Sequence, residues 1–214
     1  MADAIDLRTY TIIDVLQPQT ASFIATVAGG FLPLEGQTAL VVEVAPGMSI
    51  NMVTDAVLKQ TKAIVGMQIV ERAFGMLEVH SFDQGQIRAA GDAVLNHYGI
   101  KATDRLKPRI MTVQAITGIQ GYHTMLINRM RHGDMILQGQ TMLTLEVHPA
   151  GYAMLATNEA EKAANIHVLE MVAFGAFGRV WLGGDEENIN QAALAIEKVL
   201  NAIEGRENKG DKPS

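Results

Sequence analysis

Apolar positions along the first hundred residues follow two alternating periods. Segments rich in Thr, Ile and Val predict β-strands, because branched side chains favour an extended backbone, and these cover residues 7–16, 37–44, 64–70 and 76–81. Segments with helical character lie between them, at residues 22–27 and 86–95. A further helix is predicted after residue 49, with one buried face formed by Ile50, Val53, Val57 and Leu58.

The second hundred residues show the same order of elements. Predicted strands cover residues 108–116, 140–147, 166–172 and 179–183. Predicted helices cover residues 122–129 and 188–203, and a less regular helical face is formed by Met154, Leu155 and Ala160 to Ala163. Asp185 is a suitable N-cap for the last helix, with acidic residues in its first turn. Strands interleaved with helices in this way predict the α/β (α+β) class, an α/β sandwich with helices packed on an antiparallel or mixed sheet.

The chain also repeats its own sequence. Residues 34–46 return as residues 137–149, and the same offset pairs Thr54 with Thr157, Lys59 with Lys162, and Phe74-Gly75 with Phe177-Gly178. Upstream, Arg8 to Ile12 resembles Arg109 to Val113 at an offset near 101. We therefore expect two tandem copies of one fold, at residues 1–102 and 103–206, followed by a disordered polar tail at 207–214.

Composition narrows the possible functions. Of the 214 residues, 48% are hydrophobic and 19% are charged, which supports a packed core and leaves little charge to cover the outside, so we expect surface buried against partner subunits. The net charge of -6 disfavours nucleic-acid binding, and the absence of cysteine excludes disulfides and Cys-based metal sites. With no visible secretion signal or membrane segment, we expect a cytosolic protein.

Candidate catalytic and metal motifs are weak. The six histidines, at residues 80, 97, 123, 132, 148 and 167, form no pair with metal-ligand spacing. Neither a phosphate-binding loop nor a nucleophile elbow is present. We therefore expect no catalytic residue, no metal and no cofactor, and we interpret the twelve methionines as adaptable packing at subunit contacts.

Three motifs of the second copy carry a resemblance to a known family. They are Leu143-x-x-Glu146-Val, the run from Glu161 to Ile166, and the run from Gly175 to Asp185. In this order and spacing they resemble the bacterial microcompartment shell domain. The first copy matches more loosely, at Val42-Glu43-Val44, Asp55 to Lys59 and Glu71 to Gly75. Because each copy places a strand and a short helix before the first motif, both look circularly permuted relative to the usual family order.

The resemblance implies a structural role and an assembly. Shell domains form six-membered rings that tile into flat sheets, so three chains with two copies each would close a pseudo-hexameric homotrimer. The chain would then be a wall component of a polyhedral organelle in the bacterial cytoplasm, gating or blocking metabolites at a central pore, with no bond made or broken. Implied partners are other shell proteins laterally, encapsulated enzymes, and, for a double ring, a second stacked trimer.

The resemblance also assigns candidate site residues. The pore turns would be lined by Glu71, Arg72, Ala73, Phe74 and Gly75 in the first copy, and by Ala176, Phe177 and Gly178 in the second. Glycine is expected there because a tight turn often needs positive φ and a close backbone approach. The two phenylalanines would either form an apolar collar or fold into the core, and Glu71 with Arg72 would form either a gate or a simple strand-end salt bridge.

Three further alternatives stay open. Lys59 and Lys162 match the lysine at shell-tile edges, or they are ordinary exposed residues at helix ends. The strands upstream of each copy, 7–15 and 107–116, would either gather into a small barrel at the axis or lie at sheet edges. A different class of protein is a trimeric regulatory protein that binds a small molecule between the copies; it would stay as discrete trimers and not form sheets.

Overall fold

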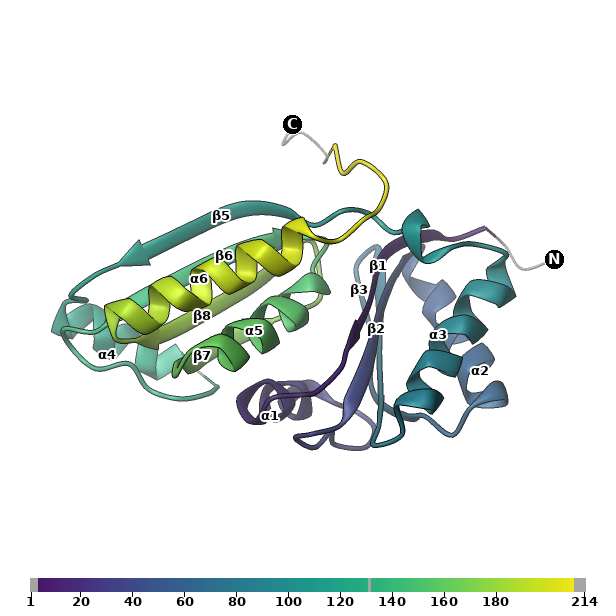
Figure 1. Cartoon of the computed structure of the whole chain (residues 1–214), viewed down its shortest axis with the longest axis horizontal. Coiled ribbons are helices and arrows are strands. Elements are labelled where there is room, and N and C mark those ends of the chain that lie inside the picture. The colour runs from purple at the N-terminus through teal and green to yellow at the C-terminus, as the bar shows by residue number, and fades with distance from the viewer. Residues whose placement is uncertain (1–3, 131, 210–214) are drawn as a thin grey trace.

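The computed structural model describes residues 4–130 and 132–209, and the chain folds into two similar units in tandem (Figure 1). The first contains strands β1 (Asp6–Ile13), β2 (Thr38–Ala45), β3 (Ile64–Glu71) and β4 (Phe74–Ser81) with helices α1 (Pro18–Val27), α2 (Ile50–Gln60) and α3 (Gln84–Tyr98). The second contains strands β5 (Arg109–Ile116), β6 (Thr141–His148), β7 (His167–Val172) and β8 (Gly178–Gly184) with helices α4 (Gly121–Met130), α5 (Tyr152–Ala163) and α6 (Glu186–Asn201). Short 3-10 turns occur at η1 (Gly47–Ser49) and η2 (Ala102–Asp104), the latter between the two copies.

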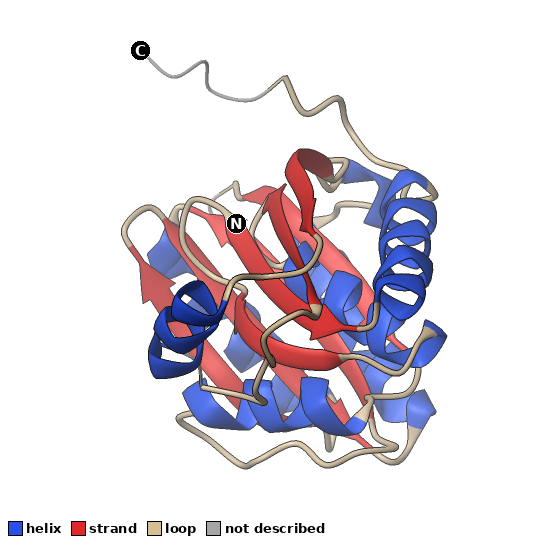
Figure 2. Ribbon diagram, turned by 90° about the vertical axis from the view of Figure 1, so that its left-hand side faces the viewer, coloured by secondary structure: helices blue, strands red, loops and turns tan. Residues whose placement is uncertain are grey.

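Each copy is built on one antiparallel sheet. The strand orders are β1-β2-β4-β3 and β5-β6-β8-β7, so the two topologies are the same, and helices flank the strands of both sheets (Figure 2). The α+β prediction with antiparallel sheets is confirmed. Strands β1 and β5 are edge strands paired with β2 and β6, so the hypothesis that they leave the sheet to form a barrel is wrong.

Strand register shows that one offset of 103 relates the two copies throughout. Leu7 lies opposite Val44 and Ile110 lies opposite Val147, and a bulge follows at the same place in both pairs. The alignment of Arg8 with Arg109 at an offset near 101 is therefore wrong. Because side chains alternate with a period of two, a shift of two residues preserves the inside-outside pattern, and the apolar pattern alone does not reveal it.

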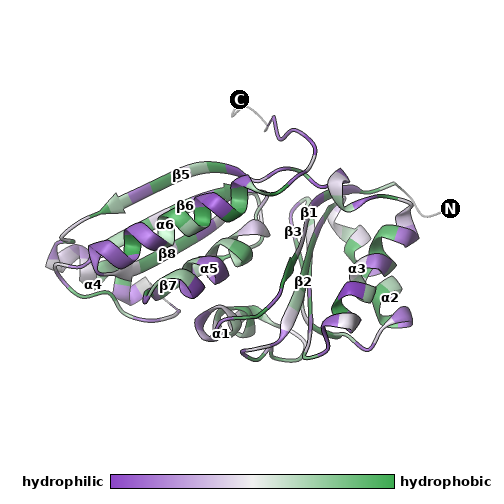
Figure 3. Cartoon of the chain, viewed as in Figure 1, coloured by the Kyte–Doolittle hydropathy of each residue, from purple (hydrophilic) through white to green (hydrophobic). Residues whose placement is uncertain are grey.

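The first sheet is covered on both faces. On one face, α2 and α3 bury an apolar cluster that includes Leu40, Val42 and Leu77. The opposite face contributes Val41 and Met76 to a second cluster, which continues into the second copy. This accounts for the continuous apolar character of β2, since a strand buried on both faces does not alternate (Figure 3).

Helix α1 belongs to the first copy in sequence but packs next to the second copy, against α5 (Figure 1). It begins at Pro18 rather than at residue 22, because proline suits the first helical position. One predicted core residue is wrong: Leu58 on α2 is 50% exposed, whereas Ile50, Val53 and Val57 are buried. Its side chain lies outside the face that α2 turns toward its own sheet.

Part of the predicted disordered tail contacts the chain between the two copies. Asn208 in the predicted tail donates hydrogen bonds from its amide to the backbone carbonyls of Lys107 and His148, at 2.9 and 3.0 Å. Arg206, which directly precedes the predicted tail, pairs with Asp6. Residues 210–214 of that tail lie outside the described residues. Within the described part of the chain, no helix has the length and apolar character needed to cross a membrane.

Candidate functional site

The candidate pore turns of the two copies lie side by side. In the first copy Arg72 and Ala73 connect β3 to β4, and in the second copy residues 173–177 connect β7 to β8. A Cβ atom added to Gly175 would lie 3.5 Å from the Cγ atom of Glu71. The structure thus brings together two of the predicted turns, which belong to segments about a hundred residues apart in the sequence.

The glycines of these turns are required for a different reason than positive φ. A Cβ atom on Gly75 would collide with the Gly47 carbonyl oxygen, and one on Gly178 would collide with the Ala150 carbonyl oxygen. Close backbone approach, which was one of the two reasons predicted from the sequence, therefore explains both glycines. The left-handed positions are the equivalent residues Arg72, with φ of 53°, and Gly175, with φ of 93°.

Both predicted pore phenylalanines are half-buried at the junction of the two copies. The Arg8 guanidinium carbon lies 3.6 Å from the centroid of the Phe74 ring, and the His148 ring lies 5.7 Å from that of Phe177. Arg8 Nη2 and His148 Nε2 are 3.0 Å apart, so the four side chains form one row across the junction. Among the described residues, neither phenylalanine belongs to the apolar core clusters.

Charge is present at only one of the two turns. Glu71 and Arg72 form a loose pair, with 3.9 Å between Arg72 Nε and the Glu71 carboxylate, and the Arg72 side chain is 86% exposed. The equivalent residues of the second copy are Phe174 and Gly175. An exposed pair at this distance gains little from the internal contact, so both charges are available to other partners.

A buried carboxylate joins the two copies below the turns. Glu43 on β2 accepts hydrogen bonds from Arg8 Nε at 2.9 Å, from the Thr9 hydroxyl at 3.0 Å and from the backbone N–H of Gly151 at 2.9 Å, just before α5. Burial raises the pKa of Glu43, and the positive charge of Arg8 opposes this increase most strongly. In the sequence, the sign of this buried carboxylate is the motif Val42-Glu43-Val44, which places a charged residue inside an apolar strand.

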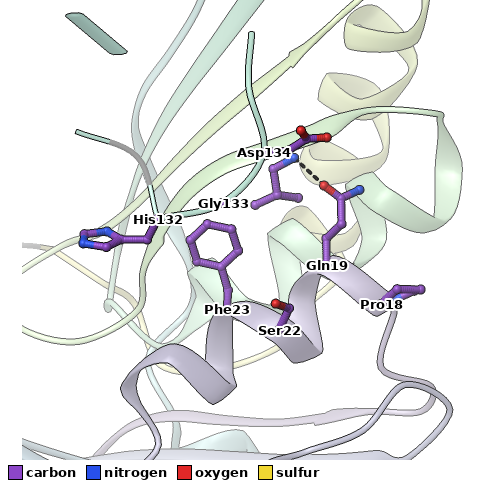
Figure 4. Close-up of a pocket in the computed structure, with 8 residues that line it drawn as sticks. Pro18, Gln19, Ser22, Phe23, His132, Gly133 and Asp134 are labelled. Carbon is purple, nitrogen blue, oxygen red and sulfur yellow. Dashed lines mark hydrogen bonds between the residues drawn. The ribbon is translucent and has the colours of Figure 1, made fainter. Parts of the chain in front are cut away.

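The same junction extends along α1. Glu161 on α5 accepts hydrogen bonds from the backbone N–H groups of Gln19 and Thr20, at 2.7 and 2.9 Å, and so caps the N-terminus of α1. The Gln19 side chain also accepts a hydrogen bond from the Val168 N–H at 2.7 Å, and the Phe23 ring packs on Gly133 (Figure 4). We call these contacts between the copies, made by Glu43 with Gly151, by Glu161 and Val168 with the first turn of α1, and by Phe23 with Gly133, the internal seam. The sequence analysis did not predict it.

Lys59 and Lys162 lie at equivalent positions away from the turns. Each is in the last turn of its helix, where its positive charge interacts favourably with the partial negative charge of the helix C-terminus. Lys59 pairs with Asp55 at 2.6 Å and Lys162 with Glu159 at 3.7 Å, and both side chains are more than half exposed. Both ammonium groups can therefore reach a neighbouring molecule.

Three histidines outside the candidate turns pair with carboxylates. His132 and His167 pair with Glu170 and Asp134, and His80 pairs with Glu78 in the interior of the first copy. Across the described ranges, no group of three or more His, Asp or Glu side chains is placed to hold a metal ion. A shallow cavity of about 400 Å³ opens between α1 and residues 132–134 (Figure 4).

A duplicated antiparallel sheet, covered by helices and with its two hairpin turns side by side, defines a class of tandem-domain proteins that includes shell proteins of bacterial microcompartments. The family model of the CsoS1D N-terminal domain matches residues 7–104. The chain is 47% identical over 208 residues to the carboxysome shell protein CcmP of Synechococcus elongatus, a match that covers 97% of this chain and 98% of that protein. It is 44% identical to the carboxysome shell protein CsoS1D of Hydrogenovibrio crunogenus, over 93% of this chain and 98% of that protein.

Solved structures give the same result. The fused permuted hexameric shell protein MSM0275 from the RMM microcompartment superimposes with a TM-score of 0.91 at 43% identity, covering 94% of this chain and 99% of that chain. The double-ringed trimeric shell protein MSM0271 superimposes with a TM-score of 0.92 at 40% identity, covering 95% of this chain and 99% of that chain. The chain belongs to the family of tandem, permuted microcompartment shell proteins. It is a structural protein of such a shell and not an enzyme, which sets aside the small-molecule-binding alternative.

Proposed function

We propose that three chains close head-to-tail into a pseudo-hexameric ring that forms one tile of the shell. The internal seam joins two different surfaces, the α5 side of the second copy and a sheet face of the first, so it is heterologous. Heterologous contacts repeat along a chain of subunits and form a closed ring when the rotation permits. Each chain still has one surface of each kind: the α2 side of its first copy and a sheet face of its second.

Exposure at equivalent positions is the observation that carries the proposal. Leu155 and Phe23, which pack in the internal seam, are 6% and 5% exposed, whereas their equivalents Met52 and Leu126 are 51% and 40% exposed. Ile13 and Ile116 show the same contrast, at 1% and 38%. These apolar side chains are exposed where a neighbouring chain would repeat the internal seam, and burial of apolar surface would favour that association.

The ring would bring six turns to its centre. The turns of the first copy contribute Glu71, Arg72, Ala73, Phe74 and Gly75, and those of the second contribute Ala176, Phe177 and Gly178. Three Glu71-Arg72 pairs would alternate with three uncharged turns, and a change of partner by Arg72 would alter the opening. We therefore propose that this pore gates or blocks metabolites, with charge supplied by alternate turns.

The edges of the tile would provide its contacts with other shell proteins. Lys59 and Lys162 support this role through their exposure and their equivalent placement at helix ends. A second, stacked trimer is supported by the double-ringed relative. Encapsulated enzymes are expected partners on the inner face of the shell.

The measurement that tests the ring is the mass of the purified chain in solution. Light scattering coupled to gel filtration should give three times the chain mass of 23.1 kDa, or six times if two rings stack. Electron microscopy of the same sample should show particles with a central axis, next to which Phe74 and Phe177 lie. A stable monomer at micromolar concentration would contradict the proposal.

A further inference from the structure

One position distinguishes the internal seam from the seam that a ring would form between chains. Inside the chain, Glu161 on α5 caps the N-terminus of α1. The equivalent residue on α2 is Leu58, which has no charge and is 50% exposed. A seam between chains that copied the internal one would therefore place an apolar side chain, and not a carboxylate, at the N-terminus of a helix.

The helix that would receive Leu58 differs in a matching way. In α1, the side chain of the N-cap residue Gln17 does not cap the helix, and the N–H groups depend on Glu161. In α4, the equivalent Gln120 accepts hydrogen bonds from the N–H groups of Tyr122 and His123, at 2.7 and 3.2 Å. The N-terminus of α4 is thus satisfied within its own copy and requires no carboxylate from a neighbour.

We infer that Leu58 of one chain packs against Tyr122 at the start of α4 in the next chain. Tyr122 is equivalent to Gln19, which contacts Glu161 in the internal seam, and its side chain is 66% exposed. The inference rests on the proposed ring, because it transfers the geometry of the internal seam to the seam between chains. It adds that the two seams differ chemically. In the internal seam a carboxylate caps the N-terminus of a helix, whereas in the seam between chains an apolar side chain packs against the start of a helix.

The neighbouring residues support a continuous apolar contact. Met52 precedes Leu58 by less than two turns of α2, and Leu126 lies about one turn after Tyr122 on α4. Both are exposed, and their equivalents Leu155 and Phe23 belong to one buried cluster of the internal seam. The contact between Leu58 and Tyr122 therefore extends an apolar strip that a second copy of this chain would cover.

Crosslinking tests the contact directly, because the chain contains no cysteine. A variant with Leu58→Cys and Tyr122→Cys, treated with a short bis-maleimide, should give covalent dimers and trimers on a denaturing gel. A matched variant with Leu194→Cys and Tyr122→Cys should stay monomeric on the gel, since Leu194 is 67% exposed on α6 and outside both seams. Equal crosslinking of the two variants would overturn the inference.

The energetic test is a single substitution on each side. Leu58→Ala and, separately, Tyr122→Ala should raise the dissociation constant of the trimer about tenfold or more, measured by sedimentation, while Leu194→Ala leaves it unchanged. Circular dichroism checks that each variant keeps its fold. If the wild-type chain is trimeric and neither seam substitution weakens it, the inference fails and the ring stands. If the wild-type chain is monomeric, the ring itself fails.

Discussion

At the scale of single residues, two equivalent glutamates have acquired different environments. Glu43 is 1% exposed and accepts three hydrogen bonds, one of them across the internal seam from the Gly151 N–H, whereas Glu146 is 31% exposed and pairs with Arg179 at 2.9 Å. The contrast arises from assembly within the chain, because the second copy covers Glu43, whereas within residues 4–130 and 132–209 no other segment covers Glu146 in this way. Residue type alone therefore does not determine the contribution of these positions.

Glu43→Ala should be far more damaging than Glu146→Ala. Removal of the Glu43 carboxylate leaves the buried Arg8 guanidinium without its ionic partner, which should lower the free energy of unfolding by about 3 kcal/mol or more. Glu146→Ala removes an exposed pair and should cost less than about 1 kcal/mol. Urea denaturation at one fixed protein concentration checks both values. Equal losses would show that the internal seam contributes little to stability.

The left-handed position of the first turn can be tested with Arg72. Both Arg72→Gly and Arg72→Ala remove the charged side chain, but only glycine adopts a φ of 53° without steric cost. Arg72→Gly should therefore be more stable than Arg72→Ala by about 1 kcal/mol in thermal denaturation. Gly175→Ala, at the equivalent position, should lose a similar amount. If the two Arg72 variants had the same melting temperature, the turn would not be held in this conformation.

At the scale of elements, periodicity predicted the order of strands and helices in both copies, and the repeat predicted that the copies share one fold. It placed Leu58 in the core because Leu58 lies on the helix next to Val57, and sequence cannot tell which flank of a helix meets its own sheet and which meets another chain. The internal seam was also not predictable, because Glu43 and Gly151 are 108 residues apart and meet only when the copies pack.

Strand β4 contains a buried pair that makes stability depend on pH. Burial raises the pKa of Glu78, and the hydrogen bond from His80 opposes this. The native state then binds the proton more tightly than the unfolded chain, so the contribution of Glu78 to stability is present at low pH and is lost as the pH rises through the raised pKa. Glu78→Gln does not titrate and should become more stable relative to the wild type as the pH rises above 4.5, the ordinary pKa of the carboxyl group.

Denaturation curves across this pH range measure the effect. The wild type measured at the same pH values is the reference for each comparison. A difference between Glu78→Gln and the wild type that stays constant with pH would mean that the native carboxyl group binds its proton no more tightly than the unfolded chain.

At the scale of the whole molecule, duplication would make one chain supply two unequal positions of the proposed ring. The first copy carries charge at its turn, at Glu71 and Arg72, and receives the second copy on a buried, polar seam. The second copy has an uncharged turn and a sheet face with exposed apolar residues. In the proposed ring, fusion of the two copies would combine two kinds of turn and two kinds of seam in fixed alternation, which six identical subunits could not do.

Assembly of rings into sheets should depend on surfaces that the ring itself does not use. Lys59 and Lys162 lie at helix ends away from the candidate pore turns, and their removal takes no side chain from either core. Lys59→Ala with Lys162→Ala should therefore keep the mass of the trimer and abolish extended sheets in electron micrographs at low salt. Lys101→Ala with Lys209→Ala changes the net charge by the same amount and should leave the sheets intact, which separates a specific edge contact from a general effect of charge. Loss of sheets in both double variants would favour net charge as the cause, and sheets in both would remove the two lysines from the lateral contact.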